Sequence, residues 1–215
     1  MPQRFLKKIK KMAFIKSFSF LNCSNSSYGK NGEKQFLSDS ETLENNFLTM
    51  VYRKENFNYP KFFKMDSASK AGFLCAELIK DGFPEDKNNF SVIMMNNFSS
   101  SETDKNFEKT ISDTANFYPS PSIFVYTLPN IMTGEICIRH GFKGESSFYV
   151  FEKFLPEEFV NIVGDSLEFC DYALAGWSES DENSALKSVV FLVSKTSESE
   201  KIFDKETVEK IYKQC

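Results

Sequence analysis

The chain has 215 residues, a formal net charge of −4 and a hydrophobic content of 41%, with 24 phenylalanines. This composition predicts one well-packed domain and does not favour nucleic-acid binding, because nucleic-acid-binding domains normally carry a basic surface. The five cysteines are widely spread without a Cys-x-x-Cys pair, and His140 is the only histidine. We therefore expect no metal or other cofactor, no disulfide framework, and no mechanism that needs two histidines.

Basic residues gather at the extreme N-terminus, where residues 1–11 contain Arg4 and four lysines. We interpret residues 1–11 as a disordered basic segment, or as an extended translation start before Met12, and residues 12–215 as a single domain. No stretch approaches the ~18 consecutive apolar residues of a membrane span. Residues 13–21 are interrupted by lysine and serine, which makes them a poor signal peptide. The sequence therefore predicts a cytoplasmic protein with no membrane span.

The first half of the chain contains three predicted elements. Residues 13–21 alternate apolar and polar side chains and predict a strand, whereas residues 22–46 are rich in Asn, Ser, Gly and charge and predict a long surface excursion. Residues 66–80 predict a helix capped by Asp66 or Ser67. Residues 90–95 are a short apolar run, which is typical of a strand buried on both faces.

The second half continues the alternation of helices and strands. Ser99 and Glu102 have the spacing of a capping box and predict a helix that carries Phe107 and Ile111. The other predicted elements are a helix after Asn130 that ends at Gly141, a strand over 147–152, a helix that starts at Pro156, strands over 171–177 and 188–194, and a final amphipathic helix with Phe203, Val208, Ile211 and Tyr212. This order predicts an α/β layered fold with much parallel strand pairing.

Several short motifs follow one another in a fixed order along the chain. Their residues are Pro121, Phe124, Pro129, Asn130, Gly134, Gly141, Gly144, Gly164, Asp165 and Gly176, and an early helix over residues 64–79 precedes them. In order and spacing these motifs resemble the N-terminal half of the β-ketoacyl synthases, over residues 12–195. The resemblance implies a thiolase-like half, a βαβαβαββ layered sheet with helices on its faces.

The resemblance fails at the catalytic residues. In the synthases the nucleophilic Cys lies nine residues beyond the second Gly of the turn, and counting from Gly144 places that slot at Lys153, preceded by Glu152. The two family histidines belong to the C-terminal half, which has no counterpart here. The departures imply a non-catalytic protein of the chain-length-factor type, although Lys153 replaces the Gln that is more usual there. Glu152 and Lys153 are interpreted either as an exposed ion pair or as a plugged nucleophile slot that faces a partner's active site.

A lone half of the synthase fold would leave one apolar face of its sheet uncovered. Either residues 22–60 and the final helix cover that face, or another chain does. In the synthases the strand before the nucleophile pairs with its counterpart across the dimer axis. The matching residues here are Phe148, Tyr149, Val150 and Phe151, which we expect to form a partner-interface strand. The alternative is an interior strand of a monomer.

The resemblance implies a function in complex with other proteins. The expected partners are a full-length ketosynthase and possibly an acyl carrier protein, in polyketide, aryl-polyene or fatty-acid-like biosynthesis. Two alternatives remain open at this point. One is a small cysteine-dependent acyltransferase or hydrolase that uses Cys137 and His140, and the other is a homodimeric acyl-binding protein.

Overall fold

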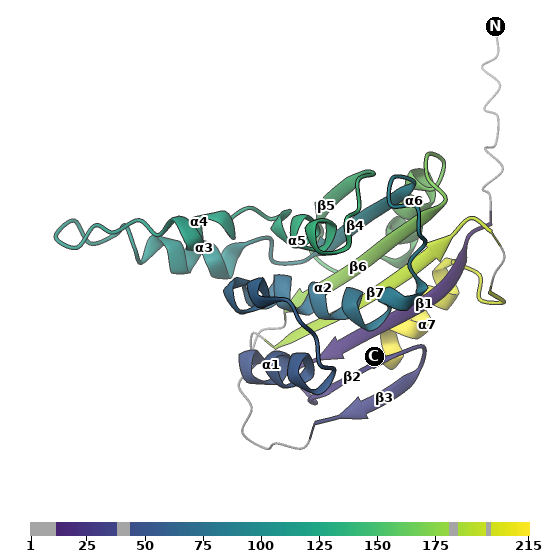
Figure 1. The fold of residues 1–215 in the computed structure, drawn as a ribbon, viewed down its shortest axis with the longest axis horizontal. Coiled ribbons are helices and arrows are strands. Elements are labelled where there is room, and N and C mark those ends of the chain that lie inside the picture. The colour runs from purple at the N-terminus through teal and green to yellow at the C-terminus, as the bar shows by residue number, and fades with distance from the viewer. Residues whose placement is uncertain (1–11, 38–43, 181–184, 197–198) are drawn as a thin grey trace, which may run out of the picture.

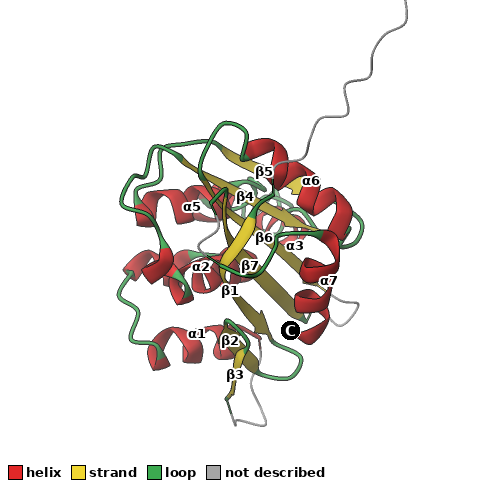
Figure 2. Cartoon of the chain, turned by 90° about the vertical axis from the view of Figure 1, so that its right-hand side faces the viewer, coloured by secondary structure: helices red, strands yellow, loops and turns green. Residues whose placement is uncertain are grey.

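The computed structural model describes residues 12–37, 44–180, 185–196 and 199–215, so the predicted disordered segment 1–11 lies outside the described residues. In this part of the chain seven strands form one sheet, with helices on both of its faces (Figures 1 and 2). The strands are β1 (Phe14–Asn22), β2 (Ser27–Lys30), β3 (Glu33–Phe36), β4 (Phe90–Asn96), β5 (Ser146–Val150), β6 (Tyr172–Ser180) and β7 (Leu186–Ser194). The helices are α1 (Glu44–Lys54), α2 (Ser67–Leu78), α3 (Ser101–Glu108), α4 (Pro121–Val125), α5 (Ile131–His140), α6 (Pro156–Ser166) and α7 (Lys205–Gln214), with short 3₁₀ helices η1 (Pro60–Lys64) and η2 (Lys80–Gly82).

The strand order in the sheet is β3-β2-β1-β7-β6-β4-β5. β4 pairs in parallel with β5 and β6, and β7 lies antiparallel between β6 and β1. Along the chain, β1, α2, β4, α5, β5, α6, β6 and β7 follow one another as β-α-β-α-β-α-β-β. The predicted α/β class and the βαβαβαββ order are therefore confirmed.

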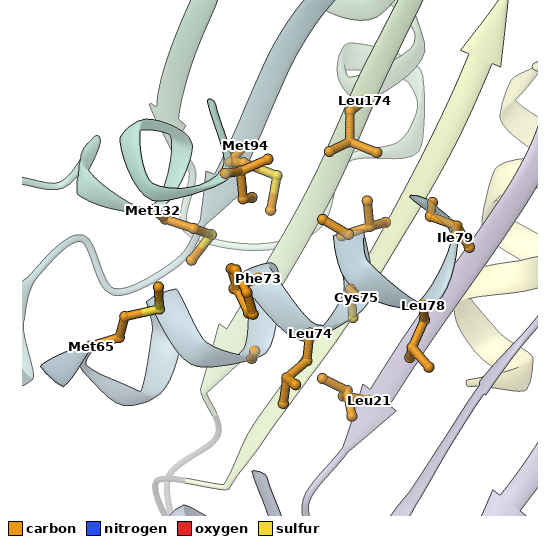
Figure 3. Packing of buried hydrophobic residues seen from close by; sticks show 14 of the residues in the cluster. Leu21, Met65, Phe73, Leu74, Cys75, Leu78, Ile79, Met94, Met132 and Leu174 are labelled. Carbon is orange, nitrogen blue, oxygen red and sulfur yellow. The ribbon is translucent and has the colours of Figure 1, made fainter. Parts of the chain in front are cut away.

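Helices α1, α2 and α5 cover one face of the sheet. Helix α2 buries Phe73, Leu74 and Leu78 among residues that include Leu21 of β1 and Leu174 of β6 (Figure 3). Ten of the 12 residues of α2 are buried, so this helix is the centre of the first hydrophobic core.

Helices α6 and α7 cover the opposite face. Phe159 and Val163 of α6, with Val208 and Ile211 of α7, pack in one cluster with Phe191 of β7. The prediction that residues 22–60 and the final helix cover one face together is therefore only partly right, because α7 lies on this face whereas α1 lies on the other. Helix α1 contributes in the same way to the first core.

Local signals set the ends of several elements where they were predicted. Asp66 Oδ1 accepts a hydrogen bond of 2.7 Å from the Ser69 amide and caps α2. Gly141 adopts φ +72° and ends α5, because this left-handed conformation favours glycine. The capping-box prediction is wrong: Ser100 is the N-cap of α3, and its hydroxyl hydrogen-bonds to Asp104 instead of the backbone.

The expected surface excursion over 22–46 is also wrong in part. Residues 27–36 form a β-hairpin that extends the sheet beyond β1, and α1 begins at Glu44. All four residues of β3 are exposed. Its sequence therefore lacks the alternation of apolar and polar residues by which a half-buried strand is predicted. Among the described residues, every helix is too short or too polar to cross a membrane.

Candidate functional site

Strand β5 lies at one edge of the sheet. It pairs with β4 on one side, and no described strand pairs with its other side. Phe148 packs against the first core, whereas Tyr149 and Val150 are 37% and 51% exposed. β5 is therefore an edge strand of the described sheet and not an interior one, and its role as a partner interface stays a prediction. An edge with unpaired backbone groups and exposed apolar side chains is suited to pairing with another chain.

The nucleophile-slot residues Glu152 and Lys153 lie between β5 and α6, and both are exposed. No ion pair joins them in the part of the chain that the structure describes, so the ion-pair interpretation is wrong. The flanking Phe151 and Phe154 turn inward and pack against the second core. Glu152 and Lys153 are therefore exposed to solvent, whereas the aromatic residues on either side of them pack against the second core and hold the loop in place.

An aromatic cluster fills the space behind the slot. The ring of Phe154 lies 4.4 Å from that of Tyr212 and 5.5 Å from that of Trp177, measured between centroids. The Tyr212 hydroxyl and the Trp177 indole both donate hydrogen bonds to Glu179, at 2.5 and 3.1 Å. Burial, helped by the Glu179 carboxylate, raises the pKa of Tyr212, so this phenol stays neutral and donates. Through Tyr212, helix α7 thus packs against Phe154 on the inner side of the slot loop.

The start of α6 does not favour an anionic nucleophile. Pro156 opens the helix, and Leu155 at the N-cap position accepts no hydrogen bond through its side chain. Glu157 and Glu158 lie in the first turn, where carboxylates stabilise a helix through its dipole and would repel a thiolate. Glu157 also pairs with Lys205 of α7 at 3.3 Å, and both side chains are largely exposed. The two carboxylates at the start of α6 would therefore oppose an activated thiolate at the slot.

The motif residues before α5 lie outside the slot. Pro121 is the first residue of α4, and Phe124 is 54% exposed, with its ring 5.3 Å from that of Phe107. Pro129 and Asn130 are exposed, and Asn130 is the N-cap of α5 without a side-chain hydrogen bond. Pro121 and Asn130 thus mark the starts of α4 and α5, and Phe124 and Pro129 are exposed.

The motif glycines have structural roles that differ from one another. A Cβ on Gly144 would lie 2.2 Å from the Phe90 carbonyl oxygen, so the turn before β5 requires glycine. A Cβ on Gly176 would meet Met94 at 2.6 Å, whereas one on Gly134 would meet nothing within 4 Å. In α6, Gly164 is half-buried and Asp165 is exposed.

Cys137 and His140 do not form a catalytic pair. Burial raises the pKa of the Cys137 thiol to about 11, the opposite of activation. Burial also lowers the pKa of His140 to about 4, and its Nε2 lies 3.5 Å from Glu77 Oε1. Among the described residues, no hydrogen bond joins the Cys137 thiol to the imidazole. This geometry does not support the cysteine-dependent alternative.

Two buried carboxylates escaped the sequence analysis. Glu77 of α2 accepts hydrogen bonds from Arg139 Nε at 2.6 Å and from Lys80 at 3.0 Å. Glu135 of α5 is 6% exposed and accepts hydrogen bonds from two tyrosines. Each glutamate lies on the buried side of its helix among apolar residues. A charged residue at an apolar position of the helical pattern was the feature of the sequence from which these buried carboxylates could have been predicted.

Comparison with known proteins places this fold in one class. No protein-family model and no curated protein sequence matches the chain. Among solved structures, the ishigamide ketosynthase/chain length factor is similar with a TM-score of 0.61 and 14% identity, over 88% of this chain and 64% of that chain. The ketosynthase ApeO in complex with its chain length factor ApeC, from Xenorhabdus doucetiae, is similar with a TM-score of 0.58 and 9% identity, over 87% of this chain and 80% of that chain.

A third similar structure is AntDE:AntF, a type II polyketide synthase acyl-carrier protein in complex with its ketosynthase bound to the hexaketide. Its TM-score is 0.56 at 12% identity, over 86% of this chain and 63% of that chain. The chain thus spans less than two thirds of the ishigamide and AntDE:AntF chains. The protein has the thiolase-like fold of ketosynthases and chain length factors, and at these identities the similarity establishes the fold alone.

Proposed function

We propose that this chain is a non-catalytic, ketosynthase-like subunit of the chain-length-factor type that pairs with an active ketosynthase. The observation that carries the proposal is edge strand β5, which exposes Tyr149 and Val150 and leads directly to Lys153. Apolar residues on an unpaired sheet edge favour cover by another chain. Lysine at the slot has no thiol with which to hold an acyl chain as a thioester.

The partner supplies the chemistry in this proposal. Glu152 and Lys153 lie just beyond the β5 edge, so they face the partner when β5 pairs with its counterpart. Three similar structures contain ketosynthases, two with chain length factors and one with an acyl-carrier protein. These complexes support a ketosynthase as the stable partner and an acyl-carrier protein as a transient one. The setting would be cytoplasmic synthesis of a polyketide, an aryl polyene or a fatty-acid-like chain.

Binding to a ketosynthase from the same organism tests the proposal. Val150→Lys places a charge on the exposed edge of β5, and Phe36→Lys places the same charge on β3 at the opposite edge, where Phe36 is 63% exposed. Sedimentation velocity of the co-expressed pair is expected to show at least about tenfold weaker binding for Val150→Lys, equivalent to 1.4 kcal/mol. Phe36→Lys is expected to bind like the unaltered chain. An equal loss of ketosynthase binding in Val150→Lys and Phe36→Lys would contradict the proposal. A stable homodimer that does not bind the ketosynthase would favour the acyl-binding alternative.

A further inference from the structure

Helices α3 and α4 form an arm that extends away from the sheet (Figure 1). Thr103 is the one buried residue of α3, and α4 has none. The arm therefore adds almost nothing to the hydrophobic core of its own chain. Five apolar side chains of α4 and of the loops on either side of it are instead exposed, at 44–82%: Phe117, Tyr118, Phe124, Val125 and Leu128. Ordering such a segment costs conformational entropy, and these exposed side chains contribute no burial within this chain to offset it.

A buried hydrogen-bond network holds the end of α4 to the body of the protein. Tyr126 directly follows α4, is 8% exposed, and donates its hydroxyl to Glu135 Oε1 at 3.0 Å. Glu135 Oε2 accepts a second hydrogen bond, of 3.2 Å, from the Tyr59 hydroxyl. Tyr59 precedes η1 and stacks on Phe73 of α2 at 5.2 Å between ring centroids. We call Tyr126, Glu135 and Tyr59 the latch.

A second contact holds α3. The Thr103 hydroxyl donates to Asp66 Oδ2 at 3.1 Å, while Asp66 Oδ1 caps α2. Between these two attachment points lies an open cavity of about 750 Å³, lined by residues of α2, α3 and α4. The packing of Tyr126 in the first core and the Thr103–Asp66 hydrogen bond therefore both attach the arm to the body.

The root of the arm adjoins the end of the proposed partner strand. Asn96 at the end of β4 accepts a hydrogen bond of 3.0 Å from the Phe151 amide, which directly follows β5. Asn96 also accepts from the Ser99 amide through its side chain at 2.8 Å, just before α3 begins. The end of β5 and the root of the arm are therefore both hydrogen-bonded to Asn96, at the carboxyl end of β4.

We propose that the latch positions the arm as a second contact surface for the ketosynthase subunit, continuous with the β5 edge. This inference rests on the proposed function and names the surface that completes it. A buried carboxylate must keep its donors, because an unpaired charge in the interior is costly. Glu135 therefore fixes Tyr126, and through Tyr126 the end of α4, in one orientation before the partner arrives.

Removing one hydroxyl from the latch tests the inference. Tyr126→Phe keeps the ring and deletes the hydrogen bond to Glu135. We expect about tenfold weaker binding to the co-expressed ketosynthase, and faster amide hydrogen exchange over residues 101–130 with unchanged exchange in β4 and β7. Tyr118→Phe is the matched control, since it deletes the same atom from a side chain that is 82% exposed, and it should bind within twofold of the unaltered chain.

Tyr118→Ser tests the arm surface without touching the latch. It should weaken ketosynthase binding several-fold while exchange over residues 101–130 stays as in the unaltered chain. Unchanged binding by both Tyr126→Phe and Tyr118→Ser, with binding lost in Val150→Lys, would overturn this inference and leave the proposed function standing. Faster exchange throughout the sheet in Tyr126→Phe would assign the tyrosine to general stability and would also overturn it. If the unaltered chain binds no ketosynthase, or if the arm variants alter only self-association, the inference fails as well.

Discussion

At the scale of single residues, close backbone approach explains a motif glycine. Gly144 lies against the Phe90 carbonyl oxygen, and a Cβ there would lie at 2.2 Å. Gly144→Ala must shift the turn or the start of β4, and we expect a loss of about 1–3 kcal/mol of unfolding free energy. Gly134→Ala in α5 is the control, because its Cβ meets nothing within 4 Å and alanine favours a helix by about 0.5–1 kcal/mol. Urea denaturation measures both, and equal effects of the two substitutions would refute the assignment.

His140 makes the stability of the protein depend on pH. Its pKa is about 4 in the folded chain, against 6.5 for the free side chain, mainly because it is buried. Glu77, Arg139, Lys80 and Lys87 also act on it electrostatically, Glu77 raising the pKa and the three cations lowering it. Between these two pKa values the unfolded chain binds more protons, so the folded state loses stability as the pH falls.

The His140→Phe variant isolates this contribution. Phenylalanine keeps the contacts with Phe83 and Phe142 and cannot take up a proton. From pH 7 to pH 4 the unaltered chain should lose about 2–3 kcal/mol more unfolding free energy than the variant. Burial, which by itself would raise the Glu77 pKa, is outweighed by Arg139, Lys80 and His140, which hold the pKa of this carboxyl below its usual value. Parallel pH profiles for the two proteins would contradict a buried neutral His140.

At the scale of elements, α7 covers the face of the sheet that α6 leaves open. Ile211 is 6% exposed and packs in the second core, and truncation to alanine would leave a cavity there. We expect Ile211→Ala to cost about 2–4 kcal/mol of unfolding free energy. Lys210→Ala on the exposed side of α7 should change it by less than about 0.5 kcal/mol. Equal stability of the two variants in chemical denaturation would show that α7 does not belong to the core.

Most of the helices and strands could be predicted from the spacing of apolar residues and from residues that start or end an element, such as N-caps and glycines. The apolar run of β4, the Asp66 cap of α2 and the Gly141 end of α5 each carry a local signal, and the structure confirms all three. β3 carries no such signal, because all its residues are exposed and it is held by β2 alone. Helix α4 is five residues long and was missed for a similar reason.

Long-range contacts were beyond reach from the sequence. The assignment of Glu152 and Lys153 to the slot uses only a local spacing, counted from Gly144, and it stays a prediction. The hydrogen bond between Tyr59 and Glu135 joins residues 76 positions apart, and the Arg139–Glu77 pair spans 62. Only the fold brings these side chains together. A single sequence shows that these residues are present but does not show which of them form hydrogen bonds with one another.

At the scale of the whole molecule, helices cover both faces of the described sheet, and its two edge strands, β3 and β5, differ in their side chains. The edge at β3 exposes Glu33, Lys34 and Gln35 beside Phe36. Charged residues on an edge strand discourage pairing, whereas β5 offers aromatic and β-branched side chains. The two edges thus differ in the way that a one-sided heterodimer requires.

Amide hydrogen exchange of β5 with and without the ketosynthase tests the central claim most directly. If β5 pairs with the partner, amides within Ser146–Val150 should exchange at least about tenfold more slowly in the complex, while those of β3 at the opposite edge remain as they were. Protection that appears elsewhere in a stable complex, with β5 exchanging as in the free chain, would contradict the account.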